Sequence, residues 1–308
     1  MSILDEPRWA FVALATAVVA RPDGAQPDAA LVPDVDRMAA LAGDILAAGC
    51  NGIVPFGTTG EGPCFSVAQR IATVDGLIAA GIPADRIIVG IGATAMDDLV
   101  VLARHAAGLG CPVLSPPPFF LRAADGPGIV KAYGQLIAQV ADPSLRLLLY
   151  NIPQVSGFAI PIDVMQALAR AHPGIVVGVK DSAPDWVAVE PVVRQRGGLK
   201  VAVGVEPFIS RAMALGGCGT ICGLSNLAPR TAARAVAGDA DANASLARLA
   251  GAFGDRAFLP TLKATLAGVR ADDAWRHPMP PIDPYGADQV SDLVAMVRTM
   301  EARVWQAA

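Results

Sequence analysis

Short apolar runs rich in Val, Ile and Leu recur along the chain, and each is followed by a loop and then by apolar residues at helical spacing. We expect strands at 9–17, 52–56, 87–92, 112–115, 145–150, 175–180, 200–204 and 219–222. We expect helices at 34–48, 66–80, 96–109, 129–140, 161–171 and 185–196. This alternation is typical of a parallel sheet that is covered by helices.

Some of these helices carry recognisable start signals. Ser66 and Gln69 form a capping-box pattern, Pro161 suits a first helical turn, and Asp185 can accept the free amides of the helix that follows it. These signals support the predicted helix positions.

The number of strand and helix units favours a closed barrel. Eight units in about 235 residues fit the size of a (β/α)8 TIM barrel, whereas an open doubly wound sheet more often has fewer strands and a Gly-rich dinucleotide turn. The nearest match to that turn, at 90–94, lacks the third glycine. We therefore predict an α/β protein with a (β/α)8 barrel over residues 1–230.

The strand pattern stops after Pro229. Helical patterns follow at 231–237, 241–257, 258–268 and 288–307, with the proline-rich stretch 278–281 as an ordered connector. We expect these residues, 231–308, to form a helical C-terminal extension of the barrel.

Composition and charge exclude several classes of protein. The chain is 53% hydrophobic and 17% charged, so it is not a disordered protein. Its apolar run at 11–20 is shorter than the roughly 20 residues of a membrane span, and Asp5 and Glu6 do not fit a secretory signal. The net charge is −4 with scattered basic residues. We expect a cytoplasmic protein that binds neither membrane nor nucleic acid.

The cysteines do not form a metal or disulfide pattern. There are five, at positions 50, 64, 111, 218 and 222, without zinc-site spacing, and the three histidines lie far from the 218/222 pair. We expect reduced thiols, with the pair at 218 and 222 buried, and no metal.

Polar residues end three of the predicted strands. Lys180 closes the apolar run at 175–180, Tyr150 closes the run at 145–150, and the stretch 57–61 (GTTGE) follows the run at 52–56. Because a (β/α)8 barrel has its active site at the carboxyl ends of its strands, we expect these residues in one mouth.

Each of these residues also has a structural interpretation. Lys180 fits a side chain that reaches solvent, or an amine that burial keeps unprotonated for attack on a carbonyl. Tyr150 fits a core aromatic residue or a general acid and base. The loop 57–60 fits a tight turn or a carboxylate pocket, and Glu61 fits a brace for that loop or a catalytic group. The three polar strand ends together favour the catalytic interpretation for Lys180 and Tyr150.

The motifs GTTGE (57–61), YNIP (150–153), GVKDS (178–182) and GGCGTICGLSN (216–226) resemble, in order and spacing, those of the dihydrodipicolinate synthase / N-acetylneuraminate lyase family of pyruvate-dependent class I aldolases. The resemblance covers nearly the whole chain. It implies a barrel with a helical C-terminal extension, a homo-oligomer (tetramer or dimer), and no metal or organic cofactor.

The resemblance also implies roles for individual residues. Lys180 would form a Schiff base with the C2 carbonyl of a 2-oxo acid, typically pyruvate, Tyr150 would carry protons, and Thr58 would orient Tyr150. Thr59 would hold the carboxylate. The other implied substrate-binding residues are Gly57, Gly60, Val155, Gly204 and Ile221. The enamine would then add to an aldehyde, or the reverse reaction would cleave a C–C bond.

Two residues depart from the family pattern. Members that make dihydrodipicolinate usually have an arginine where this chain has Val155, which is closer to the sialate-lyase branch. The stretch 115–120 places Phe119 and Phe120 where the family tends to have a tyrosine that completes a proton relay. These phenylalanines fit an apolar acceptor pocket, and Arg122 fits either a carboxylate partner or a solvent-facing residue.

We predict a Schiff-base lyase or aldolase whose small-molecule substrates are a 2-oxo acid and an aldehyde less carboxylate-rich than aspartate semialdehyde. The alternatives are 4-hydroxy-tetrahydrodipicolinate synthase of lysine biosynthesis and a deoxy-sugar-acid aldolase or dehydratase. A third alternative, from another class, is a non-catalytic sensor that binds a 2-oxo acid.

Overall fold

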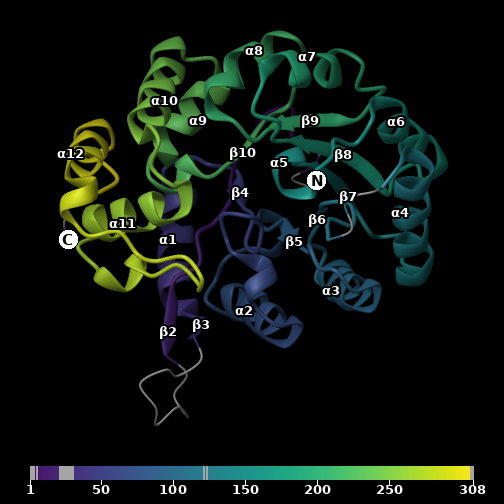
Figure 1. The fold of residues 1–308 in the computed structure, drawn as a ribbon, viewed down its shortest axis with the longest axis horizontal. Coiled ribbons are helices and arrows are strands. Elements are labelled where there is room, and N and C mark those ends of the chain that lie inside the picture. Colours follow the sequence, from purple (N-terminus) through teal and green to yellow (C-terminus); the bar gives the residue numbers. More distant parts are fainter. Residues whose placement is uncertain (1–3, 5, 21–30, 121, 123, 306–308) are drawn as a thin grey trace.

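Eight parallel strands form one barrel in the computed structural model of the chain, which describes residues 4, 6–20, 31–120, 122 and 124–305 (Figure 1). The strands are β1 (Trp9–Val12), β4 (Gly52–Ile53), β5 (Val89–Gly90), β6 (Val113–Ser115), β7 (Leu147–Asn151), β8 (Val176–Asp181), β9 (Lys200–Val203) and β10 (Gly219–Cys222). Their hydrogen-bonded order is β4-β1-β10-β9-β8-β7-β6-β5, and a parallel bridge between Ile53 and Ile87 joins the two ends. All eight predicted strands and the predicted (β/α)8 barrel are confirmed.

Helices surround the barrel and cover its outer face (Figure 1). They are α1 (Val35–Ala47), α2 (Val67–Ala79), α3 (Met96–Gly108), α4 (Gly126–Val140), α6 (Ile162–Ala171), α7 (Trp186–Arg194), α8 (Ile209–Ala214) and α9 (Pro229–Ala237). The predicted capping box of Ser66 and Gln69 is present, and Asp185 accepts the amide of Val187. Pro161 is the residue immediately before α6 rather than its first helical residue. The short helices α5 (Pro153–Ser156) and α8 were not predicted, because each spans fewer than two turns.

The apolar residues form two layers, because successive side chains of a strand point to opposite faces of the sheet. An outer layer fills the space between the sheet and the helices. A smaller inner cluster fills the barrel, with members in or next to each strand: Trp9, Phe11, Val54, Ile88, Leu114, Leu148, Tyr150, Val177, Ala202 and Ile221. Side chains therefore fill the barrel interior up to the mouth, which lies at the carboxyl ends of the strands.

The first predicted strand, 9–17, is shorter in the structure. β1 ends at Val12, although the amides of Ala13 and Leu14 still donate to carbonyls of neighbouring strands. The chain then enters an antiparallel hairpin of β2 (Val18–Ala20) and β3 (Leu31–Pro33). Two strands of three residues carry too little periodicity to be predicted.

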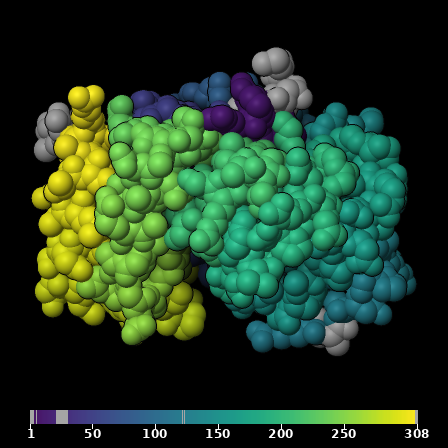
Figure 2. Space-filling model, turned by 90° about the horizontal axis from the view of Figure 1, so that it is seen from above, coloured from purple at the N-terminus to yellow at the C-terminus, as the bar shows by residue number. Residues whose placement is uncertain are grey.

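The C-terminal extension consists of α10 (Ala240–Phe253), α11 (Phe258–Arg270) and α12 (Ser291–Met300). Figure 2 shows these helices, in light green and yellow, side by side along one flank of the barrel. The predicted boundary between residues 230 and 231 falls inside α9, the helix that follows β10. The predicted helix at 288–307 is shorter, since α12 ends at Met300, and residues 306 and 307 lie outside the described residues. Within the described part of the chain, the helices are too short or too polar to cross a bilayer.

Candidate active site

Lys180 and Tyr150 lie side by side at the barrel mouth. They are paired in the register of β8 and β7, so both side chains point to the barrel interior. Lys180 is 4% exposed and Tyr150 is 5% exposed. The Nζ atom of Lys180 lies 4.3 Å from the centroid of the Tyr150 ring. The strand register therefore places the buried amine of Lys180 next to the phenol of Tyr150.

A one-residue register shift between β7 and β8 produces this pairing. Leu147 is paired with Val176, but Leu148 is paired with Gly178, so β8 contains one extra residue at Val177. In an unshifted register Tyr150 would be paired with Val179, and the Lys180 side chain would point toward the helices, because the side chains of a strand alternate. The shift turns Lys180 into the barrel.

Asn151 and Asp181, the next paired residues, hold the ends of β7 and β8 together by hydrogen bonds. Asn151 Nδ2 donates to Asp181 Oδ1 at 3.2 Å, and the Ala183 amide donates to the same oxygen at 2.9 Å. The Ile160 amide donates to Asn151 Oδ1 at 2.9 Å. Burial raises the pKa of Asp181, against the hydrogen bonds from Ala183 and Asn151. These hydrogen bonds fix the strand ends that carry Tyr150 and Lys180.

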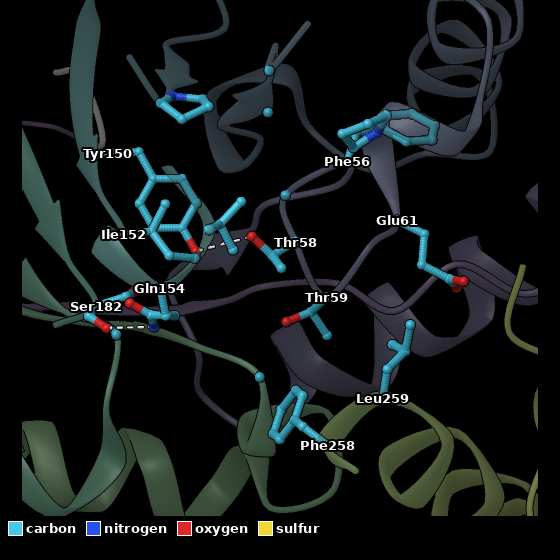
Figure 3. Close-up of a pocket in the computed structure, with 18 of the residues that line it drawn as sticks. Phe56, Thr58, Thr59, Glu61, Tyr150, Ile152, Gln154, Ser182, Phe258 and Leu259 are labelled. Atoms are coloured by element: carbon cyan, nitrogen blue, oxygen red, sulfur yellow. Dashed lines mark hydrogen bonds between the residues drawn. The ribbon is translucent and has the colours of Figure 1, made fainter. Parts of the chain in front are cut away.

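The loop after β4 brings a threonine to the phenol. Thr58 Oγ1 and the Tyr150 hydroxyl share a hydrogen bond of 3.3 Å (Figure 3). Phe56 and Glu61 have left-handed backbone conformations, with φ of 60° and 54°. Gly60 permits a close approach, because a Cβ there would lie 2.7 Å from the Phe56 amide nitrogen. Left-handed non-glycine residues cost energy and persist where the surrounding structure holds them, often at functional sites.

A cavity of about 630 Å³ opens over these groups. Most of the predicted site residues line it: Lys180, Tyr150, Thr58, Thr59, Gly57, Val155 and Gly204. Gly60 and Ile221 are not among the lining residues. The Gly60 carbonyl accepts the Thr16 hydroxyl, and Ile221 is fully buried in the inner cluster.

Gly204 leaves room for the lysine side chain. A Cβ at this position would lie 1.9 Å from Ser182 Oγ and 3.1 Å from Lys180 Cε. Gly223 likewise leaves room for two other cavity side chains, because a Cβ there would lie 2.6 Å from the Phe258 ring and 3.0 Å from Thr59 Oγ1. Both glycines therefore let cavity side chains approach one another.

Sequence reasoning missed several residues of the cavity. Ser182 lies two residues after Lys180, so strand alternation predicts that it points the same way. Glu206 lies three residues after the end of β9 at Val203, so it is a polar residue close to the carboxyl end of a strand, a weaker signal of the same kind as Lys180. Gln154, whose Nε2 donates to the Ser182 carbonyl, and Phe258 in the C-terminal extension carried no signal in the sequence.

Glu206 is a buried carboxylate in the cavity wall. The Leu224 amide donates to its Oε1 at 2.8 Å. Burial raises the pKa of Glu206, and hydrogen bonds together with the charge of Lys180 oppose that rise. The mouth of the barrel therefore holds a second ionisable group near the amine.

The five cysteines are all free thiols. Cys50, Cys111, Cys218 and Cys222 are buried and free, which confirms the burial predicted for the pair at 218 and 222, while Cys64 is exposed and lines the cavity. Within the residues that the structure describes, no cluster of three or more His, Cys, Asp or Glu side chains is placed to hold a metal ion.

A buried ion pair joins the loop after β4 to the C-terminal extension. Lys263 of α11 donates to Glu61 Oε1 at 2.6 Å, and both side chains are at most 3% exposed. The other oxygen, Oε2, accepts the Met279 amide in the connector. Burial lowers the pKa of Lys263, against the opposing effect of Glu61. Glu61 therefore braces the loop, as its structural interpretation proposed.

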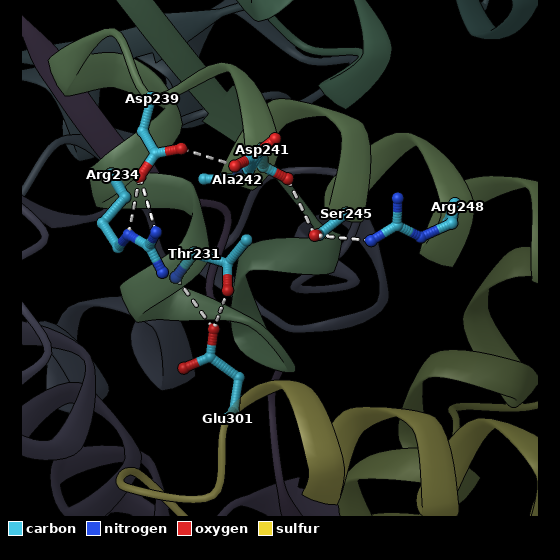
Figure 4. A network of polar contacts seen from close by, with 8 residues as sticks. All are labelled: Thr231, Arg234, Asp239, Asp241, Ala242, Ser245, Arg248 and Glu301. Carbon is cyan, nitrogen blue, oxygen red and sulfur yellow. Dashed lines mark hydrogen bonds and ion pairs between the residues drawn. The ribbon is translucent and has the colours of Figure 1, made fainter.

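A second anchor lies at the end of α12. The buried carboxylate of Glu301 accepts the amide and the hydroxyl of Thr231, in the first turn of α9 (Figure 4). Burial raises the pKa of Glu301, against these hydrogen bonds. The contact satisfies an amide that the helix itself leaves free. It ties the last helix to the barrel.

The fold and the site together define this chain as a (β/α)8 barrel protein with a buried lysine at the carboxyl ends of its strands. The sequence matches the Dihydrodipicolinate synthetase family over residues 33–297. The chain therefore belongs to this family, as the four motifs predict.

Relatives agree with this assignment. A DapA-like lyase of Chloroflexus aurantiacus is 36% identical over 185 residues, 60% of this chain and 61% of the relative. 4-Hydroxy-tetrahydrodipicolinate synthase 1 of Streptomyces coelicolor is 34% identical over 64% of this chain and 62% of the relative. The matched region thus spans about three fifths of each relative's length.

Solved structures share the whole architecture. Dihydrodipicolinate synthase from Agrobacterium tumefaciens has a TM-score of 0.85 and 26% identity, over 96% of this chain and 100% of that chain. A variant of Sulfolobus solfataricus 2-keto-3-deoxygluconate aldolase has the same fold, with a TM-score of 0.77 and 19% identity, over 96% of this chain and 97% of that chain.

Breaking the Glu61–Lys263 pair should destabilise the protein strongly. Lys263→Met leaves a buried carboxylate without its cation, and we expect a loss of about 3–5 kcal/mol in the free energy of unfolding, measured in urea. Glu61→Gln should cost a similar amount. The double variant should recover much of the loss; losses that simply add would contradict the pairing.

Removing the Glu301 carboxylate should loosen the C-terminal helix. Glu301→Ala leaves the Thr231 amide without an acceptor, so we expect a loss of about 1–3 kcal/mol in unfolding free energy. Glu301→Gln keeps one acceptor oxygen and should cost less. Equal stability of the Ala variant and the unmodified protein would argue against this anchor.

Proposed function

We propose that the protein is a lyase that makes or breaks a C–C bond between a 2-oxo acid, such as pyruvate, and an aldehyde, through a Schiff base on Lys180. The observation that carries the proposal is the buried Lys180 beside Tyr150, with Thr58 in hydrogen-bond reach of the phenol. Family membership supports it.

The first half of the proposed reaction joins the substrate to the protein. The Nζ atom of Lys180 attacks C2 of the oxo acid, and the carbonyl oxygen takes a proton from Tyr150. Loss of water from the carbinolamine leaves an iminium, and loss of a proton from C3 gives the enamine. Thr59 and the amides of the loop 57–60 hold the carboxylate of the substrate.

The second half forms the new bond. The electron pair of the enamine moves from C3 to the aldehyde carbon, and the aldehyde oxygen takes one proton. Water then hydrolyses the iminium to a 4-hydroxy-2-oxo acid and free Lys180. Thr58 orients Tyr150 through their shared hydrogen bond. Water in the open cavity exchanges protons with this pair, because the stretch with Phe119 and Phe120 has no tyrosine to complete a relay.

The runner-up is 4-hydroxy-tetrahydrodipicolinate synthase activity, which the names of several relatives favour. Val155, which lines the cavity in place of an arginine, argues against it. A sensor without catalytic activity would bind the 2-oxo acid but would not turn it over.

Trapping the Schiff base tests the proposed chemistry. Pyruvate and sodium borohydride should leave a stable adduct on the peptide that contains Lys180, detected by mass spectrometry. Lys180→Met should abolish the adduct and turnover. Lys200→Met is the matched control, because Lys200 lies at the other end of the barrel, where it donates to the Glu6 carbonyl. A protein that forms no adduct on Lys180 would refute the proposal.

Tyr150→Phe should slow adduct formation and turnover by roughly 10²–10⁴-fold, the usual contribution of a general acid and base. Tyr133→Phe is the control, because the Tyr133 hydroxyl donates to the buried Ser115 carbonyl outside the cavity. Rates of single-turnover adduct formation distinguish the two. An unchanged rate in the Tyr150 variant would reject its assigned role.

We also propose that the protein works in the cytoplasm as a homo-oligomer. Support comes from family membership and from Phe120, an aromatic residue that is 77% exposed in the single chain. Light scattering of the purified protein measures the oligomeric state directly.

A further inference from the structure

More acidic than basic side chains line the cavity. Of the described residues that line it, Lys180 is the one cationic side chain, and Glu61 and Glu206 are the acidic ones. Arg122 is exposed, packs near Gly157 and is not among the lining residues. Once Lys180 carries the neutral nitrogen of the enamine, a carboxylate on the second substrate would meet no cationic side chain among these residues.

Apolar side chains from several segments of the chain also line the cavity. Six of them, here called the apolar wall, are Phe119, Val155, Phe258, Leu259, Met279 and Ile282. Three of them keep exposed area that a substrate can cover: Val155 at 37%, Phe258 at 43% and Ile282 at 40%. Covering such area with an apolar group is favourable. In Figure 3, the Phe258 ring stands next to Thr59, so this wall adjoins the proposed carboxylate site.

Several polar groups of the cavity already have protein partners. Gln154 Nε2 donates to the Ser182 carbonyl, and Glu206 Oε1 accepts the Leu224 amide. Both carboxylate oxygens of Glu61 are hydrogen-bonded as well, to Lys263 and to the Met279 amide. A substrate with several hydroxyl groups would bury them against the apolar wall without partners, which is unfavourable.

We propose that the acceptor is an uncharged aldehyde with a bulky apolar substituent, best an aromatic ring, which lies against the apolar wall. The inference rests on the proposed Schiff-base chemistry of Lys180. In the step concerned, the enamine electron pair forms the bond from C3 to the aldehyde carbon. The aldehyde oxygen takes one proton, and water releases a 4-aryl-4-hydroxy-2-oxo acid from the lysine.

Matched aldehydes test the proposal. Benzaldehyde, 4-formylbenzoate, its neutral methyl ester and glyceraldehyde are each supplied with pyruvate, and the condensation product is quantified by mass spectrometry. We expect kcat/KM for benzaldehyde to exceed that for 4-formylbenzoate and for glyceraldehyde by roughly 10²-fold. The methyl ester should fall within about tenfold of benzaldehyde, because it is slightly larger than the carboxylate but carries no charge.

A substitution in the apolar wall tests the charge argument in the protein. Val155→Arg places a cation at the partly exposed edge of the wall, and it should raise kcat/KM for 4-formylbenzoate by about tenfold while lowering that for benzaldehyde. Val155→Met is the control, a long side chain without charge, and it should keep the preference for benzaldehyde.

Borohydride trapping of pyruvate in the same samples separates two kinds of failure. A protein without the Lys180 adduct would overturn the Schiff-base chemistry and this inference with it. A protein that forms the adduct but uses 4-formylbenzoate or glyceraldehyde as well as benzaldehyde would overturn the acceptor class alone. So would an adduct-forming protein that uses no aromatic aldehyde, or one that rejects the methyl ester as strongly as the carboxylate.

Discussion

The pairing of Lys180 with Tyr150 across β8 and β7 is the contact on which the proposed chemistry depends. In a closed barrel, residues that are paired on neighbouring parallel strands share a face, so the register decides which side chains meet in the mouth. The extra residue at Val177 shifts that register by one position. Without the shift, the amine would point into the helix layer.

The groups around this pair hold it in a narrow space. Gly204 has no side chain that would displace Lys180, and the Asn151–Asp181 hydrogen bond fixes the strand ends behind it. Glu61 extends the support to the C-terminal extension, since its two oxygens hold Lys263 and the connector. The helices after the barrel therefore supply both a brace and a wall of the cavity.

Most of the barrel could be predicted, because eight apolar runs alternate with helical periodicity. The hairpin of β2 and β3 could not, because three-residue strands have no measurable period. Lys180 and Tyr150 stand out in the sequence because each ends an apolar run. Phe258 and Met279 do not, because their place in the cavity depends on how the extension folds back, which no local pattern encodes.

The register shift at Val177 could not be predicted from the sequence either. The sequence places Lys180 at the end of a strand, but it does not say to which face the side chain points, because one extra residue reverses the alternation. Only the paired strands in three dimensions determine this. The resemblance to a family supplied that information indirectly, through the motif GVKDS.

A crystal structure of the protein after soaking with pyruvate would show directly whether Lys180 forms the Schiff base. We expect continuous electron density from Lys180 Nζ to C2 of the ligand, with the Tyr150 hydroxyl beside the new bond and the ligand carboxylate on Thr59. Pyruvate bound without a covalent link, or a Lys180 side chain that points away from the ligand, would contradict it.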